Sequence, residues 1–412
     1  MKALVLAGGL PQTELINKLK AKGIETVLAD YYEHPVARDH ADKFYRISTL
    51  DVDAIRQLAI DENVDFIITV CTDQALLTMA EVSEDLGLPC YMDFETARNV
   101  TNKAYMKKVF AENNIPSARF VTAGSMDELD TEEWRFPLIV KPVDCNSSKG
   151  VRRADNKTEL ESAFSDAVRF SRTNTAIVEK FITGKELSVD VYTENGKAIV
   201  LDITTSEKLK VKDRFIIFRT WHPANISEAI KNSVQKTAQK ISDSFGLKDS
   251  PMLIQMLSDG KEAYVIEFSA RTGGGVKHLS IGRRSGVDII SAVIDLTLGQ
   301  RPHIEVRNSE TKYMVDEYIY CKPGIFDHIE GFKELKECGI ITDYYEFCWK
   351  GTEFDSVENS GNRVGGFTIE GNTMEELRCK HDKVINEVRI ISDNGSDMMR
   401  RDLLMDFDAT EA

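Results

Sequence analysis

The segment 141–151 has the residue types that hold phosphate groups. The apolar run FPLIVKP predicts a buried strand that ends on Lys141, and a small, polar, glycine-containing stretch follows it. Small residues let backbone N–H groups approach phosphate oxygens, while lysines supply compact positive charges. The predicted phosphate-binding residues are Lys141, Asn146, Ser147, Ser148, Lys149, Gly150 and Val151. Because the segment lacks the GxxxxGK[ST] pattern, an ordinary surface turn is the competing interpretation.

A second segment, 252–271, could bind a cation next to those phosphates. The runs MLIQML and AYVIEFSAR predict two antiparallel strands joined by a glycine-containing turn. Alternation along the second strand places Glu267, Ser269 and Arg271 on one face, and strand pairing brings Gln255 beside Glu267. Hard oxygen ligands suit Mg²⁺, and Arg271 could meet charge developing on a transferred phosphoryl group. A polar sheet face without a metal ion is the alternative.

The segment 175–190 could hold the base and ribose of a nucleotide. It contains two strand patterns, TAIVEKFI and KELSVD, joined by a turn at Gly184. Exposed backbone groups at a strand end can bind an adenine edge, and the carboxylate of Glu186 can accept hydrogen bonds from ribose hydroxyls. The competing interpretation is a plain hairpin with solvated charges.

The glycine-rich segment that follows Arg271 is the candidate substrate wall. Three consecutive glycines allow a ligand to approach the backbone, and Arg271 with Arg283 or Arg284 could hold a substrate carboxylate. His278 is expected to position or support the site, and His222 follows a stretch, 207–214, that predicts a flap over it. The predicted substrate residues are Arg271, Gly273, Gly274, Gly275, His278, Arg283 and His222.

The elements that must position these residues change character along the chain. Before Pro89, short apolar runs alternate with amphipathic stretches, which predicts a parallel sheet covered by helices. Its first turn, AGGLP, is not GxGxxG, so a nicotinamide site is weakly supported. A long helical stretch is expected at 94–112, and strand patterns resume at 313–320.

These changes predict three domains: an α/β domain at 1–95, a larger domain at 96–305 divided near residue 182, and an α+β domain at 306–412. A helix is expected at 374–388, followed by a frayed tail from Asp393.

Composition limits the possible partners and locations. The chain has 412 residues and a net charge of −15, which disfavours nucleic acid and anionic membranes as nonspecific partners. Seven cysteines, with no CxxC pair, suit a reducing compartment. The apolar run at the amino terminus is too short for a signal peptide or a membrane span, so a cytoplasmic location is expected.

In their joint order, these motifs resemble the ATP-grasp superfamily, and specifically its carboxylate–amine ligases, over nearly the whole chain. The resemblance rests on Asn102-Lys103 opening a helix, on FPLIVKP with its loop, on VEKFITGKELSVD, on IQMLSDG and on VIEFSARTGGG. The leading domain looks flavodoxin-like, and GNRVGGFTIEGNTMEE looks like the trailing domain of amino-acid ligases. The resemblance therefore implies an ATP-grasp fold between an N-terminal Rossmann-like α/β domain and a small C-terminal α+β domain.

The resemblance also implies individual roles. Lys103 and Lys141 would contact the ATP phosphates, and the loop 146–151 would close over the β- and γ-phosphates. The residues that match the adenine-edge hinge and the ribose ligand are Glu179, Lys180, Phe181, Ile182 and Glu186. Gln255 and Glu267 match metal ligands, a glutamine at the first place being similar to carbamoyl phosphate synthase-like members. Where the family usually has asparagine as a further ligand, this chain has Ser269, which is shorter and neutral.

The implied reaction uses ATP with Mg²⁺, or Mn²⁺ in its place. A small carboxylate, such as that of an amino acid, would become an acyl phosphate and then join an amine, releasing ADP and phosphate. Two alternatives remain open: an enzyme that uses bicarbonate as the acid, and a nucleotide-binding regulatory protein without turnover. A homodimer is the expected assembly.

Overall fold

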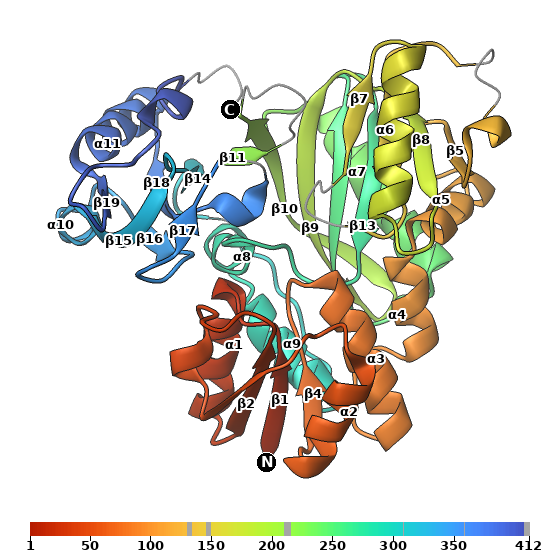
Figure 1. Ribbon diagram of the computed structural model, residues 1–412, viewed down its shortest axis with the longest axis horizontal. Coiled ribbons are helices and arrows are strands. Elements are labelled where there is room, and N and C mark those ends of the chain that lie inside the picture. The colour runs from red at the N-terminus through yellow and green to blue at the C-terminus, as the bar shows by residue number, and fades with distance from the viewer. Residues whose placement is uncertain (130–133, 146–149, 210–215, 308, 358, 408–412) are drawn as a thin grey trace.

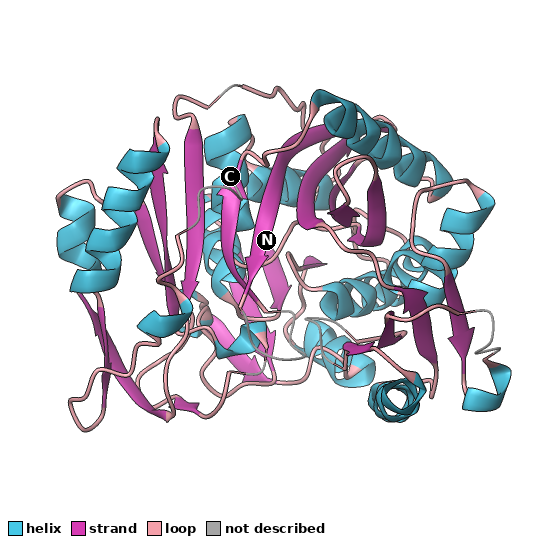
Figure 2. Cartoon of the chain, turned by 90° about the horizontal axis from the view of Figure 1, so that it is seen from above, coloured by secondary structure: helices cyan, strands magenta, loops and turns pink. Residues whose placement is uncertain are grey.

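The computed structural model describes residues 1–129, 134–145, 150–209, 216–307, 309–357 and 359–407. In these ranges the chain forms four sheets with helices packed on their faces, which confirms the predicted α/β class (Figures 1 and 2). Of the helices in the described ranges, none combines the length and apolar character that a membrane crossing needs.

The first sheet is parallel and has the strand order β3-β2-β1-β4. Its strands and helices are β1 (Lys2–Leu6), α1 (Leu10–Ala21), β2 (Glu25–Asp30), β3 (Lys43–Arg46), α2 (Val52–Asp61), β4 (Phe66–Ile68) and α3 (Asp73–Leu86). The predicted alternation of strands and helices is therefore confirmed. Strand β3 lacks an apolar run because its four residues lie on the edge of the sheet and are only half-buried or exposed.

A helix from much later in the chain completes the core of this sheet. Helix α9 (Ile289–Thr297) packs beside α1, and Ile290 and Val293 share one apolar cluster with Val5 and Leu15 (Figure 1). The apolar sequence IISAVIDLT suits a helix buried on most of its surface. Because α9 packs on this sheet, the loops at the carboxyl ends of its parallel strands lie against residues from later in the chain.

The predicted helix 94–112 is two helices, α4 (Phe94–Thr101) and α5 (Lys103–Glu112). The break occurs at Asn102, which has extended backbone geometry and accepts a hydrogen bond from the N–H of Tyr105. A side chain that caps a helix N-terminus in this way satisfies one of its unpaired donors. The cap starts a new helix whose first residue is Lys103.

A small antiparallel sheet follows, with the order β5-β8-β6-β7 and helix α6 packed against it (Figure 1). Its elements are β5 (Phe120–Ala123), β6 (Leu138–Pro142), β7 (Arg152–Ala154), α6 (Lys157–Phe170) and β8 (Ala176–Lys180). Apolar residues of β6, β8 and α6 form a separate core. This sheet carries Lys141 and Glu179 on neighbouring strands.

The largest sheet is antiparallel, with the order β13-β12-β9-β10-β11-β14-β18-β16. Its strands are β9 (Lys185–Glu194), β10 (Lys197–Lys208), β11 (Ile217–His222), β12 (Ser250–Ser258), β13 (Ala263–Ser269), β14 (Tyr313–Ile319), β16 (Asp343–Glu346) and β18 (Gly365–Gly371). Helices α7 (Glu228–Ser244) and α8 (Lys277–Ser285) contact β10. This sheet contains strands from both sides of residue 306, where the third domain was predicted to begin. The division into three domains therefore stays a prediction.

The last part of the chain adds the sheet β17-β15-β19 and two helices. These elements are β15 (Gly324–Glu330), α10 (Phe332–Glu337), β17 (Glu353–Phe354), α11 (Met374–Glu387) and β19 (Arg389–Ser392). The predicted helix 374–388 is confirmed as α11. The predicted fraying from Asp393 is wrong for residues 393–407, because Met398, Leu404 and Phe407 are buried in the same core as α11. Residues 408–412 lie outside the described ranges.

Candidate functional site

A cavity of about 360 Å³ lies between the small sheet and the largest sheet. The sequence-predicted residues that line it are Lys103, Lys141, Val151, Glu179, Lys180, Phe181, Ile182, Glu186, Gln255 and Glu267. These residues come from both sheets and from the start of α5. The structure thus brings the predicted phosphate, base and metal segments to one place, which we call the nucleotide cavity.

The segment 175–190 connects the two sheets rather than forming a hairpin. Strand β8 pairs with β5 and β6, whereas β9 pairs with β10 and β12, so the plain hairpin interpretation is wrong. At the connection, a Cβ on Gly184 would overlap the carbonyl of Ser258, so the close approach of these backbones requires glycine. The connection forms one wall of the cavity, where apolar side chains can sandwich a base. They are Ile139, Phe181, Ile182, Leu257 and Ile266.

The carboxylate of Glu179 lies between two ammonium groups at the floor of the nucleotide cavity. Lys141 Nζ is 2.9 Å from one of its oxygens, and Lys107 Nζ is 2.8 Å from the other. Burial by itself would raise the pKa of Glu179, but the charges of Lys141 and Lys107 outweigh it and lower the pKa to about 2. Glu179 is therefore an ionised support for Lys141, a role that the sequence did not predict.

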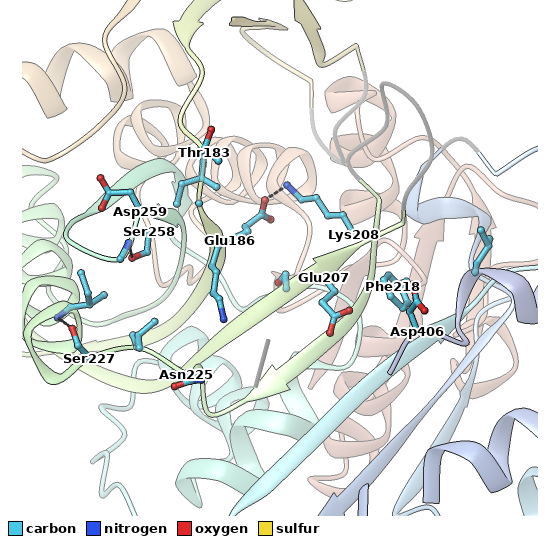
Figure 3. A pocket seen from close by; sticks show the side chains of 18 of the residues that line it. Thr183, Glu186, Glu207, Lys208, Phe218, Asn225, Ser227, Ser258, Asp259 and Asp406 are labelled. Atoms are coloured by element: carbon cyan, nitrogen blue, oxygen red, sulfur yellow. Dashed lines mark hydrogen bonds and ion pairs between the residues drawn. The ribbon is translucent and has the colours of Figure 1, made fainter. Parts of the chain in front are cut away.

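Glu186 pairs with Lys208 at the boundary between two cavities (Figure 3). Both residues line the nucleotide cavity and also a larger cavity of about 1100 Å³ bounded by Phe218, Asn225 and Asp259. The ammonium group of Lys208 reaches the carboxylate that was predicted to bind ribose hydroxyls. A nucleotide that takes this carboxylate as a ligand must share it with Lys208 or displace it.

The predicted cation-binding hairpin is confirmed in its register. Gln255 on β12 lies directly opposite Glu267 on β13. Lys103 Nζ is 3.0 Å from Glu267 Oε2, so a positive charge already lies against this carboxylate. Burial would lower the pKa of Lys103, but the charge of Glu267 outweighs it and raises the pKa. Gln255 and Glu267 are hard oxygen donors, and the ammonium of Lys103 lies beside them. Hard oxygen donors of this kind fit Mg²⁺.

Arg271 forms an ion pair with Asp73, the first residue of helix α3 in the N-terminal part of the chain. Arg271 Nε donates to Asp73 Oδ1 at 2.8 Å, and Nη2 donates to Oδ2 at 2.7 Å. The charge of Arg271 and the nearby hydroxyl of Ser269 both help to lower the pKa of Asp73.

Part of the predicted phosphate-binding loop lies outside the described residues, namely Asn146, Ser147, Ser148 and Lys149. At its start, the ammonium of Lys103 donates a hydrogen bond to the carbonyl of Cys145. At its end, Gly150 has φ of +75° and a Cβ there would lie 2.8 Å from Pro142 Cγ. The start of the loop is thus held at the first residue of α5, and its end lies against the strand that carries Lys141.

Two of the three glycines after Arg271 are required by protein neighbours. A Cβ on Gly273 would lie 3.0 Å from Asp190 Oδ1, and one on Gly275 would overlap the Tyr318 hydroxyl. Gly274 has no heavy atom of the described residues within 4 Å of a Cβ position. Close approach of a ligand was the predicted reason for all three glycines. After these contacts are considered, that reason applies only to Gly274.

The structure pairs Arg283 with the C-terminal part of the chain and buries His278. Arg283 forms an ion pair with Asp343 on β16, so it does not converge with Arg271 as predicted. Arg284 donates to the carbonyl of Thr311. His278 is buried, and burial lowers its pKa to about 4, which keeps the ring neutral near pH 7. His278 therefore fits the supporting role that was expected, whereas Arg283 joins α8 to the C-terminal part.

His222 does not lie on an exposed flap, and its prediction as a substrate residue on such a flap is wrong. It is buried on β11, with Nδ1 2.5 Å from Asp202 Oδ2 and Nε2 3.0 Å from Asp316 Oδ2. Burial would lower its pKa, but the two carboxylates outweigh burial and raise it. Two carboxylates from neighbouring strands explain how a charged ring can be buried here. Residues 210–215 of the predicted flap lie outside the described ranges.

Arg363 lies beside the glycine segment and was not predicted from the sequence. Its guanidinium lies 3.6 Å from the centre of the Tyr318 ring, and Nη2 donates to the carbonyl of Ile217, a residue of the nucleotide cavity. Its Nη1 atom comes within 3.4 Å of a Cβ position on Gly275. Arg363 stands within the motif GNRVGG, but the fold brings it to the glycine segment from almost ninety residues away.

Comparisons with known proteins agree with this geometry. Residues 134–279 match the family described as ATP-grasp domain. The formate-dependent phosphoribosylglycinamide formyltransferase of Sulfurisphaera tokodaii is 24% identical over 94% of this chain and 97% of its own length. The carbamoyl-phosphate synthase of Methanobrevibacter smithii is 22% identical over 76% of this chain and 86% of its own length.

A solved structure has a similar fold over nearly all of both chains. The L-amino acid ligase from Bacillus licheniformis superposes with a TM-score of 0.80 and 21% identity, covering 95% of this chain and 99% of that one. The predicted resemblance to the ATP-grasp superfamily and the predicted fold are thus confirmed.

Proposed function

From the premise that this chain is an ATP-grasp protein, we propose that it is a ligase that uses ATP to activate a small carboxylate and join it to an amine. The observation that carries the proposal is the nucleotide cavity, where Lys103, Lys141 and Glu267 meet from three elements. The relatives include an enzyme whose name specifies formate as the acid, which supports a small carboxylate.

The proposed reaction has two steps. In the first, a carboxylate oxygen attacks the γ-phosphorus of ATP, the bond to the β-phosphate oxygen breaks, and ADP leaves. In the second, the amine nitrogen attacks the acyl carbon, the carbon–oxygen bond breaks, and phosphate leaves while the nitrogen loses a proton to it or to water. The protein's contribution is positioning and charge compensation, for which Lys103, Lys141 and Arg271 are suited.

Mg²⁺, or Mn²⁺ in its place, would be held by Gln255, Glu267 and Ser269. The opposed register of Gln255 and Glu267 and the place of Ser269 two residues further along β13 support this ligand set. The bound ion would neutralise phosphate charge. Lys103 pairs with Glu267, and we infer that its ammonium contacts the phosphates when MgATP binds.

The direct test is release of ADP from MgATP in the presence of acids, each with and without a panel of amines. We expect release to require one small carboxylate and to leave an amide product detectable by mass spectrometry. Release that depends on bicarbonate alone would favour the carboxylating or carbamoyl phosphate type of reaction, which the likeness to a carbamoyl-phosphate synthase keeps as second candidate. Tight nucleotide binding without stimulated release by any mixture would contradict the ligase proposal.

Arg363 should hold the carboxylate of the acid substrate. We expect Arg363→Lys to raise the KM for the acid about tenfold or more, because lysine keeps the charge but cannot bind a carboxylate with two parallel hydrogen bonds. Arg283→Lys is the matched control, since Arg283 pairs with Asp343 instead. Steady-state ADP release at saturating ATP gives both KM values. A rise in KM for Arg283→Lys alone would restore the original sequence prediction.

Amino acids as substrates, a homodimer and a cytoplasmic location stay predictions. The fold likeness to an L-amino acid ligase supports including amino acids in the panel beside formate and bicarbonate.

A further inference from the structure

The loop after β4, residues 69–72, carries the first sheet to the end of the metal-binding strand. Cys71 Sγ lies 3.1 Å from Thr272 Oγ1, and the Tyr91 hydroxyl donates to the carbonyl of Ala270 at 3.5 Å. Asp73 follows as the first residue of α3 and reaches Arg271. Ligands of open α/β sheets bind outside the carboxyl ends of the strands, which is where this loop lies.

The ion pair between Asp73 and Arg271 fixes the orientation of the guanidinium. The Nε and Nη2 atoms donate to the two oxygens of Asp73, and Nη1 donates to the carbonyl of Thr272 at 2.8 Å. These bonds use three of the five N–H donors of an arginine and leave one N–H on Nη1 and one on Nη2. These two groups can donate to an oxyanion.

Asp73 is placed to hold this geometry rather than merely to balance charge. Its side chain is 15% exposed and that of Arg271 is 13% exposed, so the pair is shielded from water. It stands at the N-terminus of the 14-residue helix α3, where the helix dipole favours a carboxylate. Burial by itself would raise the pKa of Asp73, but the charge of Arg271 outweighs it and lowers the pKa.

We propose that Asp73 is a positioning residue for phosphoryl transfer, which holds Arg271 so that its two remaining N–H groups donate to the γ-phosphoryl group. This inference rests on the proposed function for the identity of the anion that Arg271 meets. Through Asp73 the N-terminal sheet takes part in the chemistry of the nucleotide cavity, although Asp73 itself contacts neither nucleotide nor acid.

A double-mutant cycle with Asp73→Asn and Arg271→Ala tests the proposal. We expect Asp73→Asn to lower the kcat for ADP release at least about tenfold, and Arg271→Ala to lower it further. The double variant should match Arg271→Ala alone, because Asp73 acts through Arg271. Losses that multiply in the double variant, or a normal kcat for Asp73→Asn, would overturn the proposal. Asp51→Asn, which removes a carboxylate at the start of α2 in the same sheet but keeps an oxygen that can cap the helix, should leave kcat unchanged.

Asp73→Glu separates positioning from charge balance. This variant keeps the negative charge beside Arg271, and therefore the fold, but moves the carboxylate by one methylene. A positioning role predicts a loss of kcat here too, whereas wild-type kcat in Asp73→Glu would show that only charge matters. Thermal melting of each variant confirms that the compared proteins are folded.

A binding cycle keeps the inference testable if turnover is absent. Calorimetry with ADP and with a non-hydrolysable ATP analogue, both with Mg²⁺, measures the preference for the γ-phosphoryl group. That preference should shrink severalfold in Asp73→Asn and more in Arg271→Ala, and the double variant should match Arg271→Ala alone. A positive binding cycle without ADP release would contradict the proposed ligase and uphold the positioning role. Release of ADP together with independent effects of Asp73→Asn and Arg271→Ala would uphold the proposed ligase and contradict the positioning role.

Discussion

Glu267→Gln should lower ATP turnover by at least about 100-fold while leaving the protein folded. The substitution keeps the size of the side chain but removes its negative charge, so it weakens the hold on Mg²⁺ and on the ammonium of Lys103, 3.0 Å away. Loss of one group that stabilises the charge of the transition state typically costs a factor of 10²–10³. The measurement is Mg²⁺-dependent ADP release under saturating ATP and acid.

Glu262→Gln is the control for this prediction. Glu262 lies near the start of the same strand and accepts a hydrogen bond from the Tyr264 hydroxyl, but it does not line the nucleotide cavity. Its replacement should leave turnover within about twofold of wild type. If Glu267→Gln were as active as Glu262→Gln, the metal site would have to be placed elsewhere.

The sequence was sufficient for those parts of the site that local patterns determine. Gln255 and Glu267 belong to two strands joined by a short turn, and the turn sets which residues face each other. The strand that ends near Lys141 could be predicted for the same reason, because its apolar run and the loop after it are contiguous in the sequence. For such segments the register of the strands follows from spacing along the chain.

The sequence was insufficient where the site depends on contacts between distant segments. Lys107, Asp73 and Arg363 each reach the site from another element, and no spacing within their own segments marks them. His222 was misplaced for the same reason. Its surroundings looked polar enough for a flap, but the partners that allow its burial, Asp202 and Asp316, come from β10 and β14.

The pair of Lys141 and Lys107 allows a contrast between binding and stability. Both ammonium groups contact the carboxylate of Glu179, but only Lys141 lines the nucleotide cavity. Lys141→Met should therefore weaken ATP binding about 10- to 100-fold, since a hydrogen bond to a charged group contributes roughly 1.5–3 kcal/mol. Calorimetric titration with MgATP measures this change directly.

Lys107→Met is the matched variant, because it removes the other partner of Glu179 in the buried interior. Both variants leave a buried carboxylate with one ammonium instead of two, so both should lower the free energy of unfolding by a few kcal/mol. Only Lys141→Met should also reduce the affinity for ATP by tenfold or more. An equal loss of affinity in both variants would mean that Lys141 acts by supporting Glu179 and the wall of the cavity, and an unchanged affinity in Lys141→Met would remove it from the phosphate site.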